Sequence, residues 1–251
     1  MPPYTPTFDA IEDRIRHYWD RRAASFTELR EVELGSDLHE RWLNEIRPHI
    51  ANAPLRILDV GTGSGFFPAL LGPLGYHVTG IDLSPQMIDE ARALCARHGI
   101  DATFAVGDAA NTPFAPASFD VILTRNLTWT LPDVEAAYAH WRDLLVPGGK
   151  LLNFDAHYGP ISMLALTQSL REEGVQNAHR DCEDADLQEC DAIKAALSVS
   201  QENRPDWDVA LLTRLGFSHV TLDRTLSERL YLTQDETFNP VKMFSIVATK
   251  P

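Results

Sequence analysis

Short apolar runs alternate along most of this chain with segments in which apolar side chains recur at helical spacing. Runs of this length are typical of buried strands, and the segments between them are long enough for crossover helices. The alternation therefore predicts a mostly parallel sheet with helices packed against it. The strands expected from these runs are 55–60, 77–81, 102–106, 119–124 and 150–154.

The helix expected after the second strand has the clearest limits. Ser84 stands where a cap would, Pro85 occupies the first helical position, and Gly99 can end the helix. Cys95 lies on the apolar face of this helix, so we expect it in the core. Further helices are expected at 66–76, 133–146 and 206–215, and a last strand at 242–250.

Two segments fall outside this alternation. Residues 8–50 show two helical patterns, and residues 158–205 show two more around an acidic, breaker-rich stretch. Insertions of this length are rarely simple connectors, and open α/β sheets bind ligands beyond the carboxyl ends of their strands. We therefore expect one domain over 1–251, made of an N-terminal helical cap (8–50), a core (55–157), an inserted helical cap (158–205) and the C-terminal part of the core (206–251).

Composition narrows the function classes. Of the 251 residues 36 are acidic and 22 basic, a formal net charge of −14 that disfavours a nucleic-acid partner. No apolar run is long enough for a transmembrane helix, and residues 1–20 lack the pattern of a secretory signal. The three cysteines are sparse and lack metal-ligand spacing, so we expect a cytoplasmic protein without a metal site or a membrane partner.

A glycine-rich loop follows the first expected strand. Gly61, Gly63 and Gly65 let the backbone approach a ligand closely. Asp82 follows Gly61 by 21 residues, where a carboxylate can accept hydrogen bonds from both ribose hydroxyls. Phe66 stands where a dinucleotide-binding fingerprint has its third glycine, and no Gly-Lys-Ser/Thr ending follows. The loop therefore predicts a ligand with a ribose but without a phosphate to bind.

Four segments carry a family resemblance: ILDVGTGSGFF, VTGIDLSPQMIDEAR, VGDAANTPFAPASFDVILTRN and LLVPGGKLL. In order and spacing they resemble the class I S-adenosylmethionine-dependent methyltransferases, most of all the small-molecule branch that includes the quinone-type methylases. The resemblance covers residues 55–155, and 206–250 by pattern. It implies an α/β, Rossmann-like fold: a seven-stranded, mostly parallel sheet with the last strand antiparallel and helices on both faces. It also implies S-adenosylmethionine as cofactor and S-adenosylhomocysteine as product.

The resemblance further implies where the cofactor lies. Asp82 would bind the ribose diol, and Asp108 would accept a hydrogen bond from the adenine amino group. Asp108 has an alternative interpretation as a turn residue, and Met87 would be buried on its helix in any case. The other cofactor contacts implied are Asp59, Gly61, Thr62, Gly63 and Gly65 at the methionine part, Leu83, Met87 and Ala109 at the adenine, and Arg125 beside the sulfonium.

The segment HYWDRRAASF, residues 17–26, resembles the helix that covers the cofactor in many relatives. Tyr18 or Trp19 would cap the sulfonium, and Arg22 would pair with the methionine carboxylate. Tyr18 is therefore a candidate both for catalysis and for cofactor binding. The alternative is that the aromatic residues of this helix only pack on the core.

Methyl transfer from a sulfonium is an in-line displacement on an activated donor, so the protein chiefly positions the reactants and excludes water. A general base is needed only if the acceptor loses a proton, and His157 is the candidate because imidazole titrates near neutral pH. Trp129 would stack on a flat acceptor or pack under its loop. The residues expected near a small-molecule acceptor are Trp19, Asn126, Trp129, Asp155 and Tyr158.

Three alternatives stay open beside a small-molecule methyltransferase. The first is a sensor that binds the cofactor without catalysis. The second is metalloid or thiol methylation, with Cys182 and Cys190 of the insertion as the available thiols. The third is a nicotinamide oxidoreductase. The sequence leaves a homodimer open, and it does not indicate whether O, N, S or C is methylated.

Overall fold

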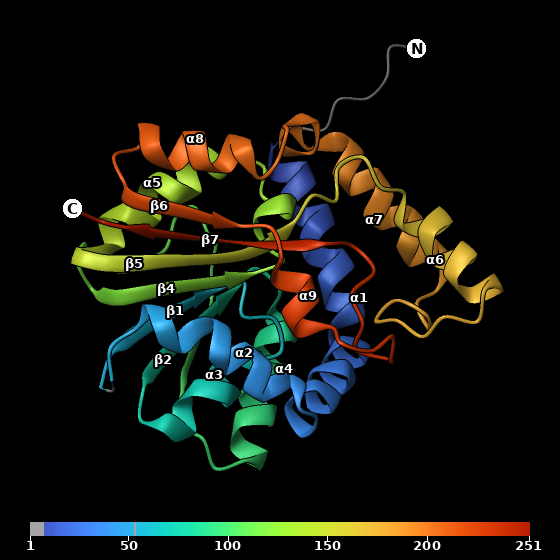
Figure 1. The fold of residues 1–251 in the computed structure, drawn as a ribbon, viewed down its shortest axis with the longest axis horizontal. Helices are drawn as coiled ribbons and strands as arrows, with labels where there is room; N and C mark the ends of the chain where they lie inside the picture. Colours follow the sequence, from blue (N-terminus) through green and yellow to red (C-terminus); the bar gives the residue numbers. More distant parts are fainter. Residues whose placement is uncertain (1–7, 53) are drawn as a thin grey trace.

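The computed structural model describes residues 8–52 and 54–251, with side chains described from Ile11 onward (Figure 1). Within them lies one sheet of seven strands in the order β3-β2-β1-β4-β5-β7-β6. Neighbouring strands from β3 to β5 are parallel, and β7 is antiparallel to both β5 and β6. This confirms the predicted seven-stranded sheet with an antiparallel last strand. The strands are β1 (Arg56–Val60), β2 (His77–Asp82), β3 (Thr103–Val106), β4 (Phe119–Arg125), β5 (Leu145–Ala156), β6 (Ser218–Asp223) and β7 (Met243–Thr249).

The strand order places a switch point beside β1. The chain runs from β1 outward to β2 and β3, and then returns to place β4 on the other side of β1. Connections leave the sheet in opposite directions at such a point, and the crevice between them is where open α/β sheets bind ligands. The glycine-rich loop leaves β1 here, facing the end of β4.

Helices surround the sheet, as predicted. In Figure 1, α5 and α8 lie above the strands, and α2, α3 and α4 lie below them. Ser84 caps α4 by accepting a hydrogen bond from the backbone nitrogen of Met87 at 3.0 Å, and Gly99 follows the helix at φ +66°. Cys95 is buried on the inner face of α4, as expected. These helices are α2 (Leu38–Ile46), α3 (Phe66–Leu71), α4 (Pro85–Arg97), α5 (Val134–Leu144), α8 (Asp206–Arg214) and α9 (Leu226–Leu230).

One boundary differs from the prediction. The helix expected over 133–146 ends at Leu144, and β5 begins at Leu145 rather than at Lys150. Leu145 pairs with Phe119 of β4, with a register irregularity before the next pair. The ladder therefore draws the segment before the Pro-Gly-Gly turn into the strand, which local spacing cannot indicate.

The two segments outside the alternation form helices, as expected, and these pack together beyond the strand ends (Figure 1). Arg14 of α1 donates to Glu189 of α7 at 2.5 Å and 2.8 Å, and Arg21 donates to Asp186 at 3.1 Å. The N-terminal and inserted segments are therefore tied to each other as well as to the core. Besides α2, which lies below the strands, they comprise α1 (Phe8–Gly35), α6 (Met163–Glu172) and α7 (Asp184–Ala196).

Within the described residues, no helix is both long enough and apolar enough to cross a membrane.

Candidate functional site

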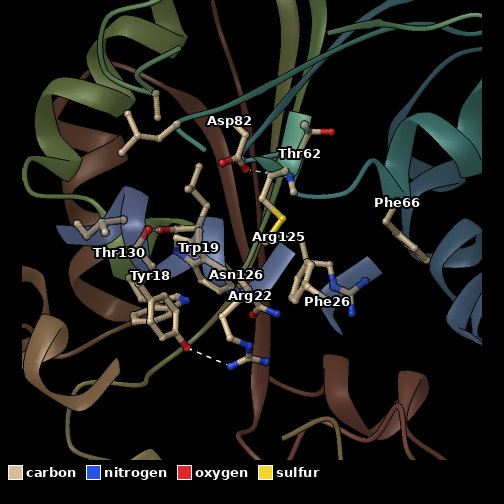
Figure 2. A pocket seen from close by; sticks show the side chains of 18 of the residues that line it. Tyr18, Trp19, Arg22, Phe26, Thr62, Phe66, Asp82, Arg125, Asn126 and Thr130 are labelled. Atoms are coloured by element: carbon tan, nitrogen blue, oxygen red, sulfur yellow. Dashed lines mark hydrogen bonds between the residues drawn. The ribbon is translucent and has the colours of Figure 1, made fainter. Parts of the chain in front are cut away.

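A long cavity runs along α1, between that helix and the carboxyl ends of β1, β2 and β4 (Figure 2). We call it the α1 cavity. Its lining extends on α1 from Glu12 to Glu33, a span of roughly 30 Å at the rise of an α-helix. The residues of the sequence prediction that line it are Tyr18, Trp19, Arg22, Asp59, Gly61, Thr62, Gly63, Asp82, Leu83, Met87, Asp108, Ala109, Arg125, Asn126, Trp129 and Tyr158.

The glycine-rich loop approaches both α1 and the loop after β4. Gly61 has φ +67°, and a Cβ there would lie 2.7 Å from Leu127. Gly63 has φ +53°, and a Cβ there would lie 3.1 Å from the edge of the Phe26 ring. A side chain at either position would be strained and crowded, so the bare backbone forms this wall of the cavity.

Gly65 does not line the cavity. At φ +87° it precedes α3, and a Cβ there would lie 3.0 Å from the Cβ of Ala91 on α4. This third glycine therefore serves the close packing of two helices, and it is not placed on the cavity wall where a contact with the cofactor was expected.

Asp82 ends β2 and faces the cavity. Its two carboxylate oxygens each accept one backbone hydrogen bond at 2.9 Å, from Gly63 and from Ser84. Burial raises the pKa of Asp82 to about 6, opposed by these two hydrogen bonds and by one from the backbone of Leu83. The carboxylate lines the cavity and, as an acceptor, suits a hydroxyl group of a ligand.

Asp59 lies deeper, at the end of β1. The hydroxyl of Thr62 donates to it at 2.6 Å, and burial raises the pKa of Asp59 to about 7. A buried carboxyl in this state is suited to a cationic ligand group, which would restore its charge. It therefore fits the ammonium of a methionine moiety.

The opposite side of the cavity suits a flat, apolar ring. Leu83 and the buried side chain of Met87 line it, beside Asp108 and Ala109. One oxygen of Asp108 accepts from the backbone nitrogen of Ala110 at 2.8 Å, so Asp108 is a turn residue and also lines the cavity. The turn interpretation of Asp108 is therefore confirmed, and its expected hydrogen bond with an adenine amino group stays a prediction.

α1 brings an aromatic and cationic face to the same cavity (Figure 2). Arg22 donates to the hydroxyl of Tyr18 at 3.4 Å, and both residues are buried. Trp19 packs edge-to-face against Tyr18 and Phe26, with ring centroids 5.0 Å and 5.6 Å apart. The Tyr18–Arg22 pair and the glycine loop therefore line one cavity, although the sequence separates them by some forty residues.

Beyond this region the cavity opens into a chamber lined by Asn126, Trp129 and Tyr158. The hydroxyl of Tyr158 donates to Asn126 at 3.1 Å and accepts from the amide of Asn239 at 3.0 Å. The rings of Trp129 and Tyr158 lie 4.9 Å apart. Asn126 has φ +54°, an uncommon conformation for a residue other than glycine that often marks a functional site.

Arg125 lines the cavity, but its guanidinium is engaged with α1. It donates to both oxygens of Glu33 at 2.8 Å and 2.9 Å and lies over the rings of Trp42 and Phe66 at 4.5 Å and 5.0 Å. Glu33 is fully buried. This side chain therefore anchors α1, and its expected contact with a sulfonium stays a prediction.

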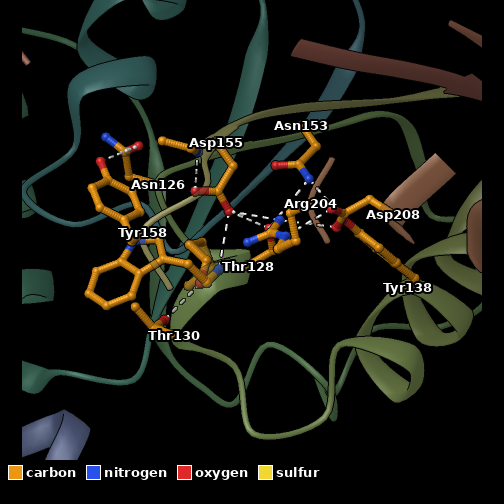
Figure 3. Close-up of polar contacts among 12 residues, drawn as sticks. Asn126, Thr128, Thr130, Tyr138, Asn153, Asp155, Tyr158, Arg204 and Asp208 are labelled. Atoms are coloured by element: carbon orange, nitrogen blue, oxygen red, sulfur yellow. Dashed lines mark hydrogen bonds and ion pairs between the residues drawn. The ribbon is translucent and has the colours of Figure 1, made fainter. Parts of the chain in front are cut away.

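Asp155 lies outside the cavity lining, in a buried polar network (Figure 3). It accepts from the backbone nitrogen of Trp129 at 3.1 Å and from the hydroxyl of Thr128, and it pairs with Arg204 at 3.2 Å. Arg204 also pairs with Asp208 at 2.8 Å. Asp155 therefore positions the Trp129 loop, and the structure does not place it in the lining of the cavity where the acceptor was expected.

His157 is also absent from the described residues that line the cavity. Its pKa is lowered, first by burial and then by the charge of Arg204. It lies on the side of β5 where Arg204 and Glu202 approach. The structure therefore does not bring the expected general base to the chamber.

Several cavity residues escaped the sequence interpretation. Phe26, Arg30 and Glu33 continue the helical stripe of Tyr18 and Arg22 along α1, so the spacing could have indicated them. Others come from distant loops without a motif, among them His179, Tyr231, Thr237 and Asn239.

The two cysteines of the insertion do not form a thiolate pair in the chamber. Cys190 lines the cavity, whereas Cys182 is not among its lining residues. Burial raises the pKa of Cys190 to about 11 and also raises that of Cys182, so both are thiols at neutral pH. In the part of the chain that is described, no group of three or more His, Cys, Asp or Glu side chains could hold a metal ion.

Comparisons with known proteins agree with this geometry. Residues 57–149 match the family model described as a methyltransferase domain. The chain is 29% identical over 185 residues to a ubiquinone biosynthesis O-methyltransferase of Nitrosococcus oceani, covering 70% of this chain and 75% of that protein. It is 32% identical to a demethylmenaquinone methyltransferase of Thermus thermophilus, over 48% of this chain and 56% of that one. Several other curated relatives are matched over only about half of their length.

The fold is also similar to that of solved methyltransferases. The structure of Haemonchus contortus phosphoethanolamine N-methyltransferase 2 in complex with S-adenosyl-L-methionine superposes with a TM-score of 0.64 at 18% identity. The match covers 100% of this chain and 61% of that one. At this identity the likeness concerns the fold.

Proposed function

Since this chain belongs to the class I S-adenosylmethionine-dependent methyltransferases and is similar to their quinone-methylase branch, we propose that it transfers a methyl group from S-adenosylmethionine to a small organic acceptor. One observation carries this proposal. A single cavity joins the Gly61–Asp82–Asp108 wall, which suits the cofactor, to a chamber under α1 that can hold a second molecule.

The residues that line the cavity suit the ribose, the methionine part and the adenine of the cofactor. Asp82 lines the cavity at the end of β2 and suits the ribose hydroxyls as a hydrogen-bond acceptor. Asp59 suits the methionine ammonium, and Arg22 suits the carboxylate because it is buried beside Tyr18. Leu83 and Met87 suit the adenine ring. The cofactor, when bound, supplies a methyl group already activated by its positive sulfur.

The chain's own contribution to the reaction is to position the two reactants and to exclude water from the cavity. Tyr18, Trp19 and Trp129 line the same cavity with aromatic side chains. Holding the acceptor in line with the methyl group lowers the entropic part of the barrier, and excluding water strengthens the electrostatics of the site. Segments 8–50 and 158–205 close this cavity over the core, so we treat residues 1–251 as one methyltransferase domain.

We assign no general base. His157 lies outside the chamber lining, and burial lowers the pKa of His179, which does line it, to about 3. An imidazole with so low a pKa is a weak proton acceptor at neutral pH. The proposal is therefore a reaction that depends on orientation, with an acceptor that is already nucleophilic at neutral pH.

The test combines binding with transfer. S-adenosylhomocysteine binding is measured by calorimetry, and label transfer from methyl-labelled S-adenosylmethionine is measured in a metabolite extract. Asp82→Asn should weaken binding by about tenfold or more. The asparagine forms no charged hydrogen bonds, and its side-chain NH2 group faces one of the backbone N–H groups that the carboxylate accepts from. Asp89→Asn, an exposed change on α4, is the matched control and should bind as the wild type does.

Each contrary result has a distinct meaning. Wild-type protein that does not bind S-adenosylhomocysteine would refute the proposal outright. Binding without label transfer to any component of the extract would support the alternative of a cofactor sensor.

A further inference from the structure

Arg30 is a buried cation of the α1 cavity that the proposed reaction does not use. Its exposed fraction is 5%, and it lines the chamber. Its Nε has no hydrogen-bond partner among the described residues. A buried guanidinium with an unsatisfied donor is costly, and such groups in native structures usually have a ligand or a role.

Glu33, the carboxylate next to Arg30, already binds a second arginine. Glu33 lies 3.1 Å from a terminal nitrogen of Arg30, but both oxygens of Glu33 accept from Arg125 at 2.8 Å and 2.9 Å. Two guanidinium groups thus share one carboxylate, which leaves one positive charge in excess. Burial, and then the charge of Arg125, lower the pKa of Arg30 to about 10, so Arg30 is still protonated at neutral pH.

The other carboxylates that line the cavity do not pair with Arg30. Glu12 lies 18 residues earlier on α1, roughly 27 Å away along the helix axis. Asp59, Asp82 and Asp108 lie at the strand ends, where the cofactor fits. None of these forms an ion pair with Arg30 among the described contacts. The excess charge therefore remains local to the chamber.

Arg30 is also separated from the cofactor end. The edge of the Phe26 ring faces Gly63, whereas Arg30 lies over the face of that ring at 4.4 Å. Besides Arg125 and Glu33, the groups that act electrostatically on Arg30 are Tyr231 and Tyr158, and both line the cavity. Arg22, two helical turns earlier, is the arginine that the family resemblance assigned to the cofactor, and it also lines the cavity.

We propose that the chamber contains an anion subsite centred on Arg30, and that the acceptor is a small organic carboxylate. One excess positive charge matches one carboxylate, whereas a phosphate monoester carries about −1.5 to −2 at neutral pH. Asn239 and Tyr231 supply neutral polar groups nearby, and Leu29 and Met163 supply apolar wall for the body of the acceptor. This inference rests on the proposed methyl transfer and names the substrate class of that same site.

The experiment uses matched probes on the full chain. Benzoate, benzamide and phenyl phosphate are titrated in the presence of saturating S-adenosylhomocysteine, and binding is followed by ligand-detected NMR. Benzoate should bind about tenfold more tightly than benzamide, because the two differ chiefly in charge. Arg30→Gln should remove this preference, and Arg30→Lys should retain part of it because the charge remains. Arg47→Gln, which changes an exposed arginine, is the control and should keep the preference.

The outcomes separate this inference from the proposed function. No preference of the wild type for benzoate, while S-adenosylhomocysteine binds, would overturn the carboxylate subsite alone, and this comparison depends on no variant. A preference for phenyl phosphate would overturn the carboxylate in favour of a phosphate monoester. Loss of S-adenosylhomocysteine affinity in Arg30→Gln, with its melting temperature unchanged, would assign Arg30 to the cofactor and refute the subsite. Absence of S-adenosylhomocysteine binding to the wild type would refute the proposed function itself.

Discussion

Replacing Glu33 by glutamine tests the central ion pair of the cavity. Glu33 is fully buried and accepts from Arg125 through both oxygens, and it lies 3.1 Å from Arg30. Glutamine keeps the shape but removes the charge, so two buried guanidinium groups lose their shared counter-ion. Breaking a buried pair in this way costs about 3–5 kcal/mol.

The expected loss is large compared with the free energy of unfolding of a typical domain, about 5–15 kcal/mol. For a chain of this size, the midpoint of thermal unfolding should fall by about 2–4 °C for each kcal/mol, or about 6–20 °C in total. Urea denaturation followed by circular dichroism measures the free energy directly. Glu40→Gln breaks an exposed pair with Arg47, so this control should cost at most about 1 kcal/mol.

The same change should act in the opposite direction on anion binding. With Glu33 neutral, the chamber holds two excess positive charges instead of one, so benzoate should bind more tightly and stabilise the variant more than the wild type. A Glu33→Gln variant within about 1 kcal/mol of the wild type would refute the reasoning, because the pair would then contribute no more than an exposed one. Glu33→Asp keeps the charge; equal losses in both variants would attribute the effect to packing.

Two further predictions concern protonation. The affinity for S-adenosylhomocysteine should rise as the pH increases through about 6, because the pKa of Asp82 is about 6 and only its ionised form accepts both ribose hydroxyls. Calorimetry between pH 5 and 8 measures this, and an affinity that falls over the range would contradict it. His157→Ala should leave the rate of methyl transfer within about threefold, since His157 does not line the cavity. A loss of about a hundredfold at unchanged cofactor affinity would restore His157 as the base.

The strands and the cofactor wall were accessible from the sequence because they depend on local patterns and spacings. Alternating apolar runs indicated the strands, and the carboxyl ends of parallel strands meet at one edge of a sheet. Gly61, Asp82 and Asp108 each follow such an end, so their meeting in one cavity follows from strand order alone.

The sequence did not indicate in which direction the side chains at this edge of the sheet point. β5 is buried on both faces along residues 151–156, so its sequence carries no alternation that separates cavity from core. Asp155 and His157 were expected at the acceptor because they follow this strand. Asp155 is directed instead to Arg204, which arrives from a loop some fifty residues later.

Taken alone, the sequence determined the sheet, the capped α4 helix and the glycine loop with its two acidic partners, because each depends on short-range periodicity or on a fixed spacing. Only the tertiary structure decided what the chamber contains. The sharing of Glu33 between Arg30 and Arg125, and the approach of Tyr231 and Asn239, bring together residues from α1, β4 and the C-terminal loops. Such long-range packing sets burial and charge balance, and no local pattern records it.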